Sequence, residues 1–233
     1  MNQQEIQKII NQTQKFYDTV APSFSATRQK PWRGWDRALE HIKKLENPKI
    51  LDLGCGNGRF YDFLSQNLRT SFSYTGLEIN DVLLAEARGK YQNGNFQKHD
   101  IFIHLDKITK KYDIIVAFGI THHIPDMEFR KNWFSTLPKI LSPGGLLIFT
   151  IWDFSKDKRF KNRAVKAKSL GEDDYLYNWG NVSEKRYFHK YNKEEMLLLR
   201  EILQEGGLKL VENYLSDGKG NNLNNYFIYA LLP

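Results

Sequence analysis

Apolar residues along this chain recur with two different periods, one typical of helices and one typical of strands. Helical spacing predicts a first helix at residues 3–17 and a second at about 34–46, with an irregular segment between Pro22 and Pro31. From there onward, short apolar runs alternate with amphipathic segments, which predict strands and helices in turn. The strands are expected at 50–53, 73–78, 95–98, 113–118 and 146–151, and the helices near 59–68, 81–90 and 126–141.

The strand at 113–118 is apolar on both faces, which suits a parallel sheet covered by helices on each side. After the fifth strand, a charged and aromatic stretch to about Tyr191 shows no regular period and is expected to be irregular. A helix at 193–205 and two final strands near 208–215 and 226–232 follow, joined by a hairpin-like turn. The pattern predicts one α/β domain with a doubly wound, mostly parallel seven-stranded sheet and an antiparallel C-terminal hairpin.

The chain has 233 residues, enough for one large domain with a full core. Its 41% apolar and 26% charged residues are ordinary for a globular protein. No apolar run reaches transmembrane length, and the polar N-terminus lacks the core of a signal peptide. Cys55 is the only cysteine, so no internal disulfide can form. Together these features favour a cytoplasmic protein without a membrane partner.

The formal charge is +7, and a block of basic side chains falls between residues 156 and 168 against a single acid, Asp157. Such a block suits contact with nucleic-acid phosphate, although a solvated helix face explains it equally well. Its basic residues are Lys156, Lys158, Arg159, Lys161, Arg163, Lys166 and Lys168. Lys156, Arg159 and Arg163 are predicted to bind the substrate.

Residues 49–59, KILDLGCGNGR, are the most informative segment, because Gly54, Gly56 and Gly58 follow an apolar run that contains an acid. Glycines at the end of a strand allow positive φ angles and a close approach of the backbone to a ligand. A dinucleotide fingerprint would need its third glycine at Arg59, and the G-K-[ST] of a P-loop is absent. The alternating glycines resemble motif I of the class I S-adenosylmethionine (SAM) methyltransferases, with an ordinary glycine-rich turn as the alternative.

This resemblance implies a SAM site at the carboxyl ends of the strands, in a Rossmann-like class I methyltransferase fold. Glu78 ends the second strand, where an acid can accept hydrogen bonds from both ribose hydroxyls. Asp100 is expected to meet the adenine amino group with Ile101 near the ring, although a helix N-cap is the alternative for Asp100. Asp52 is expected to order the loop and, through water, the methionine amino group. The other predicted cofactor contacts in this core are Cys55, Asn57, Ile79, Phe118 and Gly119.

Two adjacent histidines, His122 and His123, follow the fourth strand. Adjacent residues of an extended chain point in different directions, so at most one of the two is expected to face the ligand. His123 is predicted to lie near the methionine end of the cofactor, as a cofactor-binding and catalytic residue. A zinc site is not expected, because no third or fourth ligand follows at a recognisable spacing.

Four segments carry a closer resemblance, to the tRNA wobble-uridine carboxymethyl methyltransferases, which esterify the carboxylate of a 5-carboxymethyluridine. They are residues 16–32, the glycine segment 51–58, the Ile-Thr-His-His-Ile of residues 120–124, and Asn178-Trp179 with the Arg-Tyr-Phe-His of residues 186–189. The resemblance spans nearly the whole chain. The segment between 152 and 186 is nevertheless short for this family, and Asn178 replaces its usual proline.

The closer resemblance implies a SAM-dependent O-methyltransferase that acts on tRNA, with a small zinc-bearing activator protein that some relatives require. A carboxylate is already ionised at neutral pH and needs no general base, so the site instead needs a donor that orients it. Arg186, Tyr187 and His189 are the candidate catalytic donors. Trp179 is a candidate stacking surface for the base of the substrate.

The N-terminal segment implies that Tyr17, Arg28 and Trp32 close over the cofactor, with Arg28 pairing its carboxylate. The single methyltransferase domain would then consist of an N-terminal helical cap (1–47), a SAM-binding core (48–151), a substrate-recognition insertion (152–192), and a C-terminal helix and hairpin (193–233). Two other functions stay open. One is methylation of a small-molecule acid or amine, and the other is a SAM-binding regulatory subunit without turnover.

Overall fold

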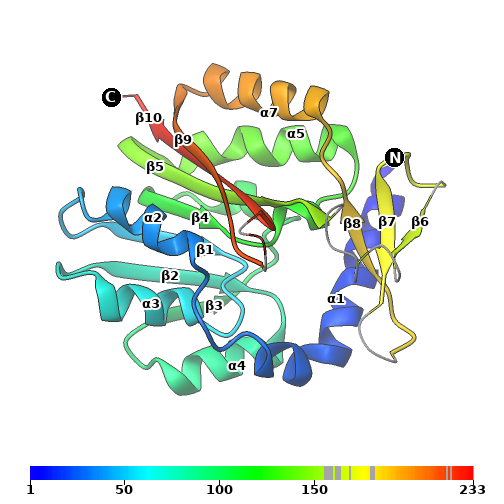
Figure 1. Cartoon of the computed structure of the whole chain (residues 1–233), viewed down its shortest axis with the longest axis horizontal. Coiled ribbons are helices and arrows are strands. Elements are labelled where there is room, and N and C mark those ends of the chain that lie inside the picture. Colours follow the sequence, from blue (N-terminus) through cyan, green and yellow to red (C-terminus); the bar gives the residue numbers. More distant parts are fainter. Residues whose placement is uncertain are drawn as a thin grey trace.

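The computed structural model describes residues 1–154, 160, 164–167, 169–178, 182–218, 220 and 222–232. Its main feature is a seven-stranded sheet with the order β3-β2-β1-β4-β5-β10-β9 (Figure 1). Neighbouring strands are parallel from β3 to β5, whereas β10 runs antiparallel to β5 and β9. The strands are β1 (Lys49–Leu53), β2 (Ser73–Glu78), β3 (Asn95–Lys98), β4 (Tyr112–Ala117), β5 (Leu141–Trp152), β9 (Leu208–Ser216) and β10 (Asn224–Leu231). The predicted doubly wound sheet with its antiparallel hairpin is confirmed.

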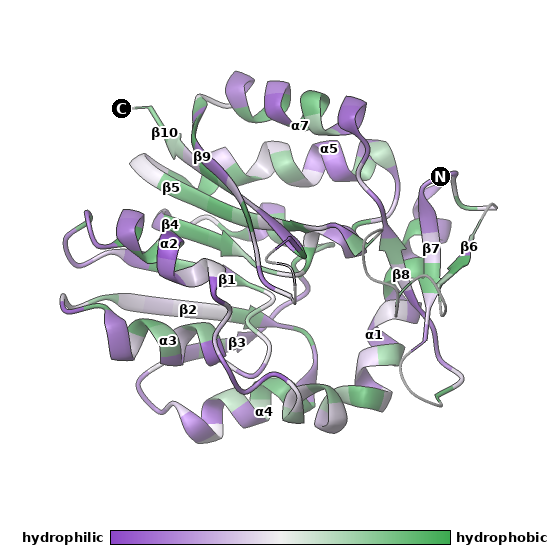
Figure 2. Cartoon of the chain, in the orientation of Figure 1, coloured by the Kyte–Doolittle hydropathy of each residue, from purple (hydrophilic) through white to green (hydrophobic). Residues whose placement is uncertain are grey.

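Helices cover both faces of the sheet, and side chains of the central strands alternate between two hydrophobic cores. In β4, Ile115 and Ala117 belong to the core that includes α5 and α7, whereas Ile114 and Val116 belong to the core that includes α2, α3 and α4. Figure 1 shows α5 and α7 on one side of the sheet and α3 and α4 on the other, and Figure 2 shows the apolar strands between them. The helices are α2 (Gly34–Ile42), α3 (Arg59–Asn67), α4 (Asp81–Lys90), α5 (Met127–Thr136) and α7 (Lys193–Glu205).

Helix α1 (Gln3–Ala26) is longer than predicted, because it continues through Pro22 instead of ending before it. A capping box between Asn2 and Glu5 starts the helix, and each side chain accepts a hydrogen bond from the backbone of the other. Pro22 removes one backbone donor. The preceding Ala21 is fully buried, so packing holds this last turn in the helical conformation.

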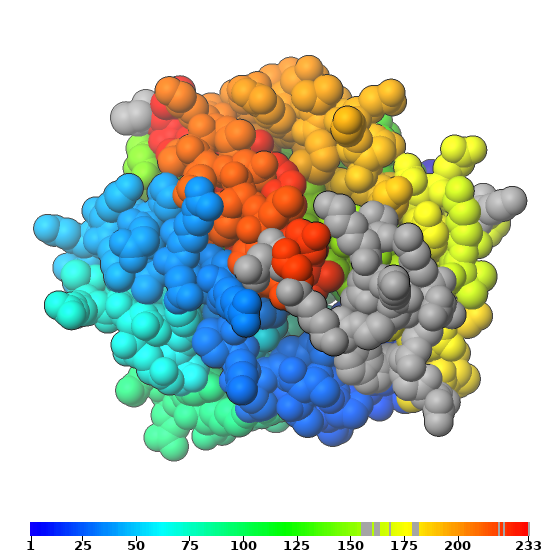
Figure 3. Space-filling view, viewed as in Figure 1, coloured from blue at the N-terminus to red at the C-terminus, as the bar shows by residue number. Residues whose placement is uncertain are grey.

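The N-terminal segment packs across the carboxyl ends of the strands. Helix α1 contacts α4 and the strand β8 (Arg186–His189), which lie at opposite ends of it. Beyond α1, the Gly34 N–H donates a 3.0 Å hydrogen bond to the buried carboxylate of Asp217, in the turn between β9 and β10. In Figure 3 the blue N-terminal residues accordingly meet this orange-red turn over the middle of the molecule. The N-terminal segment and the β9–β10 turn therefore meet at the carboxyl ends of the strands.

The stretch expected to be irregular contains a second sheet, so that prediction was wrong. Three antiparallel strands pair in the order β6-β7-β8, at the right of Figure 1. The other two strands are β6 (Ala164–Lys166) and β7 (Asp174–Tyr177). Strands of three or four residues are too short to show a period of two in the sequence. Their pairing depends on tertiary contacts, such as those of β8 with α1.

One boundary within the main sheet also differs from the prediction. The helix expected at 126–141 ends at Thr136, and a 3₁₀ turn (Leu137–Ile140) follows it. The strand β5 then begins at Leu141 rather than at residue 146. Pro138 has no backbone N–H to donate to the preceding turn, which favours the end of the α-helix at this point.

Candidate active site

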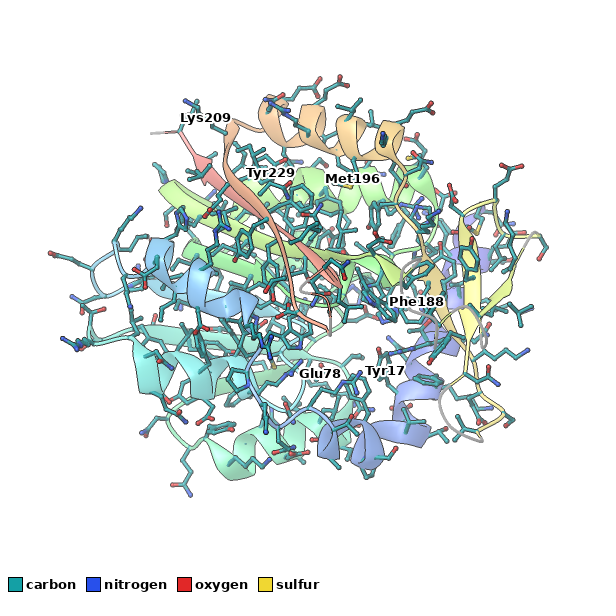
Figure 4. The ribbon with its side chains drawn as sticks, viewed as in Figure 1. Tyr17, Glu78, Phe188, Met196, Lys209 and Tyr229 are labelled. Carbon is teal, nitrogen blue, oxygen red and sulfur yellow. The ribbon has the colours of Figure 1, made fainter. Side chains whose placement is uncertain are left out.

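A cavity of about 840 Å³ lies at the carboxyl ends of β1 to β5, where a doubly wound sheet binds its ligand. Its walls come from α1 and the segment after it, the loops after these strands, β8, and the turn between β9 and β10. Figure 4 shows Tyr17 on α1, Glu78 at the end of β2 and Phe188 on β8 around this region. The predicted location of the ligand site therefore coincides with a large cavity.

The glycine loop after β1 depends on left-handed backbone at three positions. The φ angles of Gly54, Gly56 and Gly58 are 74°, 57° and 80°. A Cβ atom on Gly54 would lie 2.5 Å from a side-chain carbon of Ile120, whereas a Cβ atom on Gly56 would meet nothing within 4 Å. Gly56 thus faces open space and leaves room for a ligand beside the backbone.

Gly58 is a predicted cofactor residue that has another function. It caps the N-terminus of α3 and is not among the residues that line the cavity. A Cβ atom at this position would lie 2.9 Å from the ring of Tyr91. Gly58 therefore serves the turn and its packing. Cys55 does line the cavity, and burial raises the pKa of its thiol well above the ordinary value, which keeps it protonated and unreactive.

Glu78 joins two loops at the floor of the cavity. Its Oε2 accepts a hydrogen bond from the Gly56 N–H at 3.0 Å, and its Oε1 accepts bonds from Ile79 and Asn80 at 2.9 and 2.8 Å. An ionised carboxylate has about four acceptor positions, so these three bonds leave one for a ligand hydroxyl. Burial raises the pKa of Glu78, although the three backbone N–H groups oppose that rise.

Asp52 and Asp100 are the other two acids predicted to serve the cofactor, and both line the cavity. Asp52 accepts a 2.5 Å hydrogen bond from the Tyr74 hydroxyl, and burial raises the pKa of Asp52 to about 7. Asp100 accepts bonds from the backbone of Phe102 and Ile103 through Oδ1. Oδ1 of Asp100 therefore serves the turn. Among the described residues, its Oδ2 accepts one bond, from the amide of Gln14 on α1 at 3.1 Å, and keeps capacity for a second donor.

Helix α1 is hydrogen-bonded to each of the four strand-to-helix loops around the cavity. The loop after β1 is held by Asn57, whose amide donates to the Ser25 hydroxyl at 2.8 Å and to the Arg28 carbonyl. The Asn57 amide is therefore committed to the cap rather than free for a ligand. The remaining three pairs are Asn80 with Asp18, Asp100 with Gln14, and His123 with Tyr17. The N-terminal helix is thus tied to the loops that surround the cavity.

The hydrogen bonds of His123 define its protonation state. Nδ1 lies 2.7 Å from the Tyr187 carbonyl oxygen, which can only accept, so Nδ1 carries the proton. Nε2 therefore accepts from the Tyr17 hydroxyl at 2.9 Å, and that hydroxyl in turn accepts from Arg186 Nη1 at 2.5 Å. Burial lowers the pKa of His123 to about 3, which agrees with a neutral ring. His123 and Arg186 both line the cavity.

Tyr187 and His189, the other two candidate catalytic donors, point away from the cavity. Successive residues of β8 face opposite sides, so Arg186 faces the cavity while Tyr187 and His189 enter a buried polar network. The Tyr187 hydroxyl donates to Asp174 at 2.5 Å, and the two His189 nitrogens lie 2.7 Å from Asp174 and 2.5 Å from Glu195. Their role is structural, because the network joins the small sheet to α7.

The remaining predicted contacts divide into two groups. Arg28, Trp32, Ile79, Ile101, Phe118 and Gly119 all line the cavity. The Arg28 guanidinium carbon lies 4.2 Å from the Phe24 ring centroid, and a Cβ atom on Gly119 would lie 3.0 Å from Trp32. Trp32, in the segment after α1, therefore packs closely against the backbone of Gly119. Trp179, Lys156, Arg159 and Arg163, the predicted substrate contacts, lie outside the described residues.

Two further cavity residues that the sequence did not assign to the ligand site are His122 and Trp152. His122 and His123 belong to a 3₁₀ turn, Thr121–His123, in which neighbouring residues are about 120° apart rather than on opposite faces. Both rings therefore reach the cavity, and the prediction that at most one faces the ligand was wrong. Trp152 ends β5, and its place at the carboxyl end of a strand was a signal that could have identified it.

Known proteins resemble this chain in sequence and in fold. A family model described as a methyltransferase domain matches residues 24–213. A protein of Encephalitozoon cuniculi named as a methyltransferase is 30% identical over 201 residues, which cover 85% of this chain and 88% of that protein. A tRNA (carboxymethyluridine(34)-5-O)-methyltransferase of Schizosaccharomyces pombe is 23% identical over 92% of this chain and 93% of its own length. Some relatives are much longer, and the matched part covers only 32% of one from Arabidopsis thaliana.

A solved structure of an S-adenosylmethionine-dependent methyltransferase from Clostridium acetobutylicum shares the fold, with a TM-score of 0.65 at 17% identity over 96% of this chain and 99% of that one. The chain belongs to the family of methyltransferase domains. Its class is that of the SAM-dependent methyltransferases, as the glycine loop predicted, and SAM is the cofactor of this class. The open space beside Gly56 and the remaining acceptor position of Glu78 fit that group. Among the described residues, no helix is both long and apolar enough to span a membrane.

Proposed function

We propose that this protein transfers a methyl group from SAM to the carboxylate of a modified wobble uridine in tRNA and so forms an ester. The observation that carries the proposal is Arg186, a cation only 4% exposed that lines the cavity. Arginine matches the geometry of a carboxylate and stays charged when buried. The match to the Schizosaccharomyces pombe relative covers 93% of that protein, and the name of that protein supports tRNA as the substrate.

The cofactor would lie along the glycine loop. The backbone of Gly54 to Gly56 would approach it closely, and Glu78 would accept a hydrogen bond from a ribose hydroxyl. The free acceptor capacity of Asp100 Oδ2 suits the adenine amino group. Arg28, which lines the cavity from the segment after α1, would pair with the methionine carboxylate.

SAM, when bound, supplies a methyl group to an oxygen nucleophile. The residues of this chain need not remove a proton, because a carboxylic acid with a pKa near ~4 is already ionised at neutral pH. Arg186 would hold the carboxylate in line for transfer, while the Tyr17 hydroxyl fixes one Arg186 nitrogen. The neutral ring of His123 orients Tyr17 and accepts no proton from the substrate. The cap of α1 keeps water away from the reacting atoms.

The proposal is tested by incubating the protein with labelled SAM and tRNA that carries 5-carboxymethyluridine at the wobble position, with and without the small zinc-bearing activator of related enzymes. We expect a base-labile methyl ester in the digested nucleosides. Arg186→Lys should bind S-adenosylhomocysteine as the wild type does but transfer methyl groups at least about tenfold more slowly. The exposed Arg37 provides the control, as Arg37→Lys should behave as wild type. A wild-type protein that binds the cofactor but labels no tRNA with either preparation would refute the proposal.

Two further parts of this proposal concern Trp179 and the basic block, which, apart from Lys166 in β6, lie outside the described residues. Trp179 would stack on the base, and the basic block from Lys156 to Lys168 would contact tRNA phosphate. Neutralising Lys156, Arg159 and Arg163 together should weaken tRNA binding and its salt dependence without changing cofactor affinity. Unchanged tRNA affinity would favour a small-molecule acid as the acceptor. Binding of SAM without turnover of any acceptor would favour a regulatory subunit. A cytoplasmic location and an activator protein stay predictions.

A further inference from the structure

Three of the residues that line the cavity each have a buried nitrogen atom without a hydrogen-bond partner among the described residues. These atoms are Nε of Arg186, Nδ1 of His122 and Nε1 of Trp152, and all three residues line the cavity. Arg186 is 4% exposed and His122 is 5% exposed, so bulk water does not reach these atoms freely. Buried polar groups normally have partners, and a cluster of unpaired ones beside a cavity therefore points to a ligand.

The three side chains come from different elements, β8, the 3₁₀ turn after β4, and the end of β5, yet they surround one ring. The centroid of Phe188 lies 4.8 Å from that of His122 and 4.9 Å from that of Trp152. The Arg186 guanidinium carbon lies 4.5 Å from the same centroid. The His122 and Trp152 rings are also in edge contact at 5.4 Å. The three side chains therefore lie close together around this buried ring.

The chemistry of these nitrogens selects an acceptor-rich, negatively charged group. Arg186 and Trp152 can only donate hydrogen bonds, and Arg186 carries a positive charge. His122 is neutral, because burial and the nearby charges lower its pKa well below the ordinary value, and it can donate from one nitrogen. A carboxylate has two oxygens and about four acceptor positions, which matches three donors when His122 carries its proton on Nδ1. An ammonium group would be repelled by Arg186 and would leave every donor unpaired.

We propose that Arg186, His122 and Trp152 form a subsite that binds the carboxylate of the methyl acceptor, and that this subsite selects acids over amines. The identity of the acid as a substrate rests on the proposed function, whereas the preference for a carboxylate rests on the three donors alone. Tyr17 occupies Nη1 of Arg186, so that the unpaired Nε is held in a fixed direction. Trp152 and His122 then supply specificity that a single arginine cannot.

A carboxylate in this subsite could come from the acceptor or from the methionine end of the cofactor, and the experiment separates these two sources. The probes are 5-carboxymethyluridine, its carboxamide and 5-aminomethyluridine, each titrated calorimetrically into the protein saturated with S-adenosylhomocysteine. We expect the acid to bind at least about tenfold more tightly than either of the others, since a hydrogen bond to a charged group is worth this factor or more.

Trp152→Phe removes one donor and keeps the aromatic ring, and it should weaken binding of the acid by about tenfold. His122→Phe should have an effect of similar size. Neither variant should change the affinity for S-adenosylhomocysteine. His104→Phe is the matched control, because His104 also has a buried unpaired Nδ1 but is not among the cavity residues. This control should bind the acid as the wild type does.

Equal affinity for the three probes, or a Trp152→Phe variant that melts like the wild type and binds the acid as well, would overturn the subsite. Loss of S-adenosylhomocysteine affinity with unchanged affinity for the acid would assign the donors to the cofactor and also overturn it. If His122→Phe does not fold, Trp152→Phe alone decides. Selective binding of the acid together with no methylation of tRNA would sink the proposed tRNA substrate and leave the subsite standing.

Discussion

The Tyr17 hydroxyl donates a hydrogen bond to Nε2 of His123 at 2.9 Å and so joins the N-terminal helix to the loop after β4. The two residues are 106 positions apart in the sequence. Because the Tyr187 carbonyl fixes the proton on Nδ1 of His123, the direction of this bond is determined. The same hydroxyl accepts from Arg186, so one tyrosine orients the cation that faces the cavity.

Tyr17→Phe removes this hydroxyl and leaves two buried groups, His123 Nε2 and Arg186 Nη1, without their partner. We expect a loss of about 1–3 kcal/mol in the free energy of unfolding, measured by urea denaturation, because buried polar groups would lose their hydrogen bonds. Methyl transfer should fall by more than cofactor affinity does. Tyr112→Phe, at the far end of β4 from the cavity, is the control and should retain full activity. A Tyr17→Phe protein with wild-type stability would contradict this role.

A comparison of Gly56→Ala with Gly144→Ala should separate the cost of backbone strain from the loss of cofactor contact. Gly56 and Gly144 both have positive φ, 57° and 74°, and a Cβ atom would meet no atom within 4 Å at either position. Each alanine substitution should therefore cost a similar strain of about 1–2 kcal/mol. Only Gly56 faces the cofactor cavity, so only Gly56→Ala should weaken S-adenosylhomocysteine binding, by at least about tenfold. Calorimetric titration of both variants measures this difference, and equal affinities would remove the glycine loop from the cofactor site.

Glu78→Gln changes an acceptor that holds two loops and faces the ligand. The amide oxygen can replace one carboxylate oxygen, but the NH₂ group would meet a backbone N–H and cannot accept from it. We expect cofactor affinity to fall by at least about tenfold and the melting temperature to fall as well. Glu128→Gln, a control in an exposed ion pair with Lys131, should change neither quantity. Retained affinity in Glu78→Gln would eliminate the ribose contact.

The buried network around His189 predicts a stability that depends on pH. Burial opposes the charged ring, but hydrogen bonds to Asp174 and Glu195 outweigh burial and raise the pKa of His189. The stability that its charge contributes is therefore fully present below the unfolded-state pKa of about 6.5 and is lost as the pH rises through the higher folded-state pKa. Melting temperatures between pH 6 and 9 should fall for the wild type more steeply than for His189→Gln.

The two acids of this network, Asp174 and Glu195, predict a loss of stability at low pH. Hydrogen bonds and the charge of His189 lower the pKa of Asp174 and of Glu195 in spite of their burial. Their contribution is present above their unfolded-state pKa values near ~4 and is lost as the pH falls through the lower folded-state values.

The prediction for His189 has its own contradicting outcome. If the melting temperatures of wild type and His189→Gln change in parallel across the alkaline range, His189 is neutral in the folded protein.

The sequence by itself determined the main sheet, the order of its helices, and the glycine loop with Glu78. These features depend on local patterns, because a strand buried on both faces is a continuous apolar run and a left-handed turn beside a ligand requires glycine. The sequence also named Arg186 and His123 as candidate site residues, and both line the cavity. It could not separate Arg186 from Tyr187 and His189, which belong to the same short motif.

Only the tertiary structure decided the rest. The small sheet β6-β7-β8 directs Arg186 into the cavity and its neighbours Tyr187 and His189 into a buried network, because alternate residues of a strand face opposite sides. Packing carries α1 through Pro22, and α1 then reaches all four loops around the cavity. The subsite of Arg186, His122 and Trp152 unites three distant segments around Phe188, and no local pattern encodes a contact of that kind.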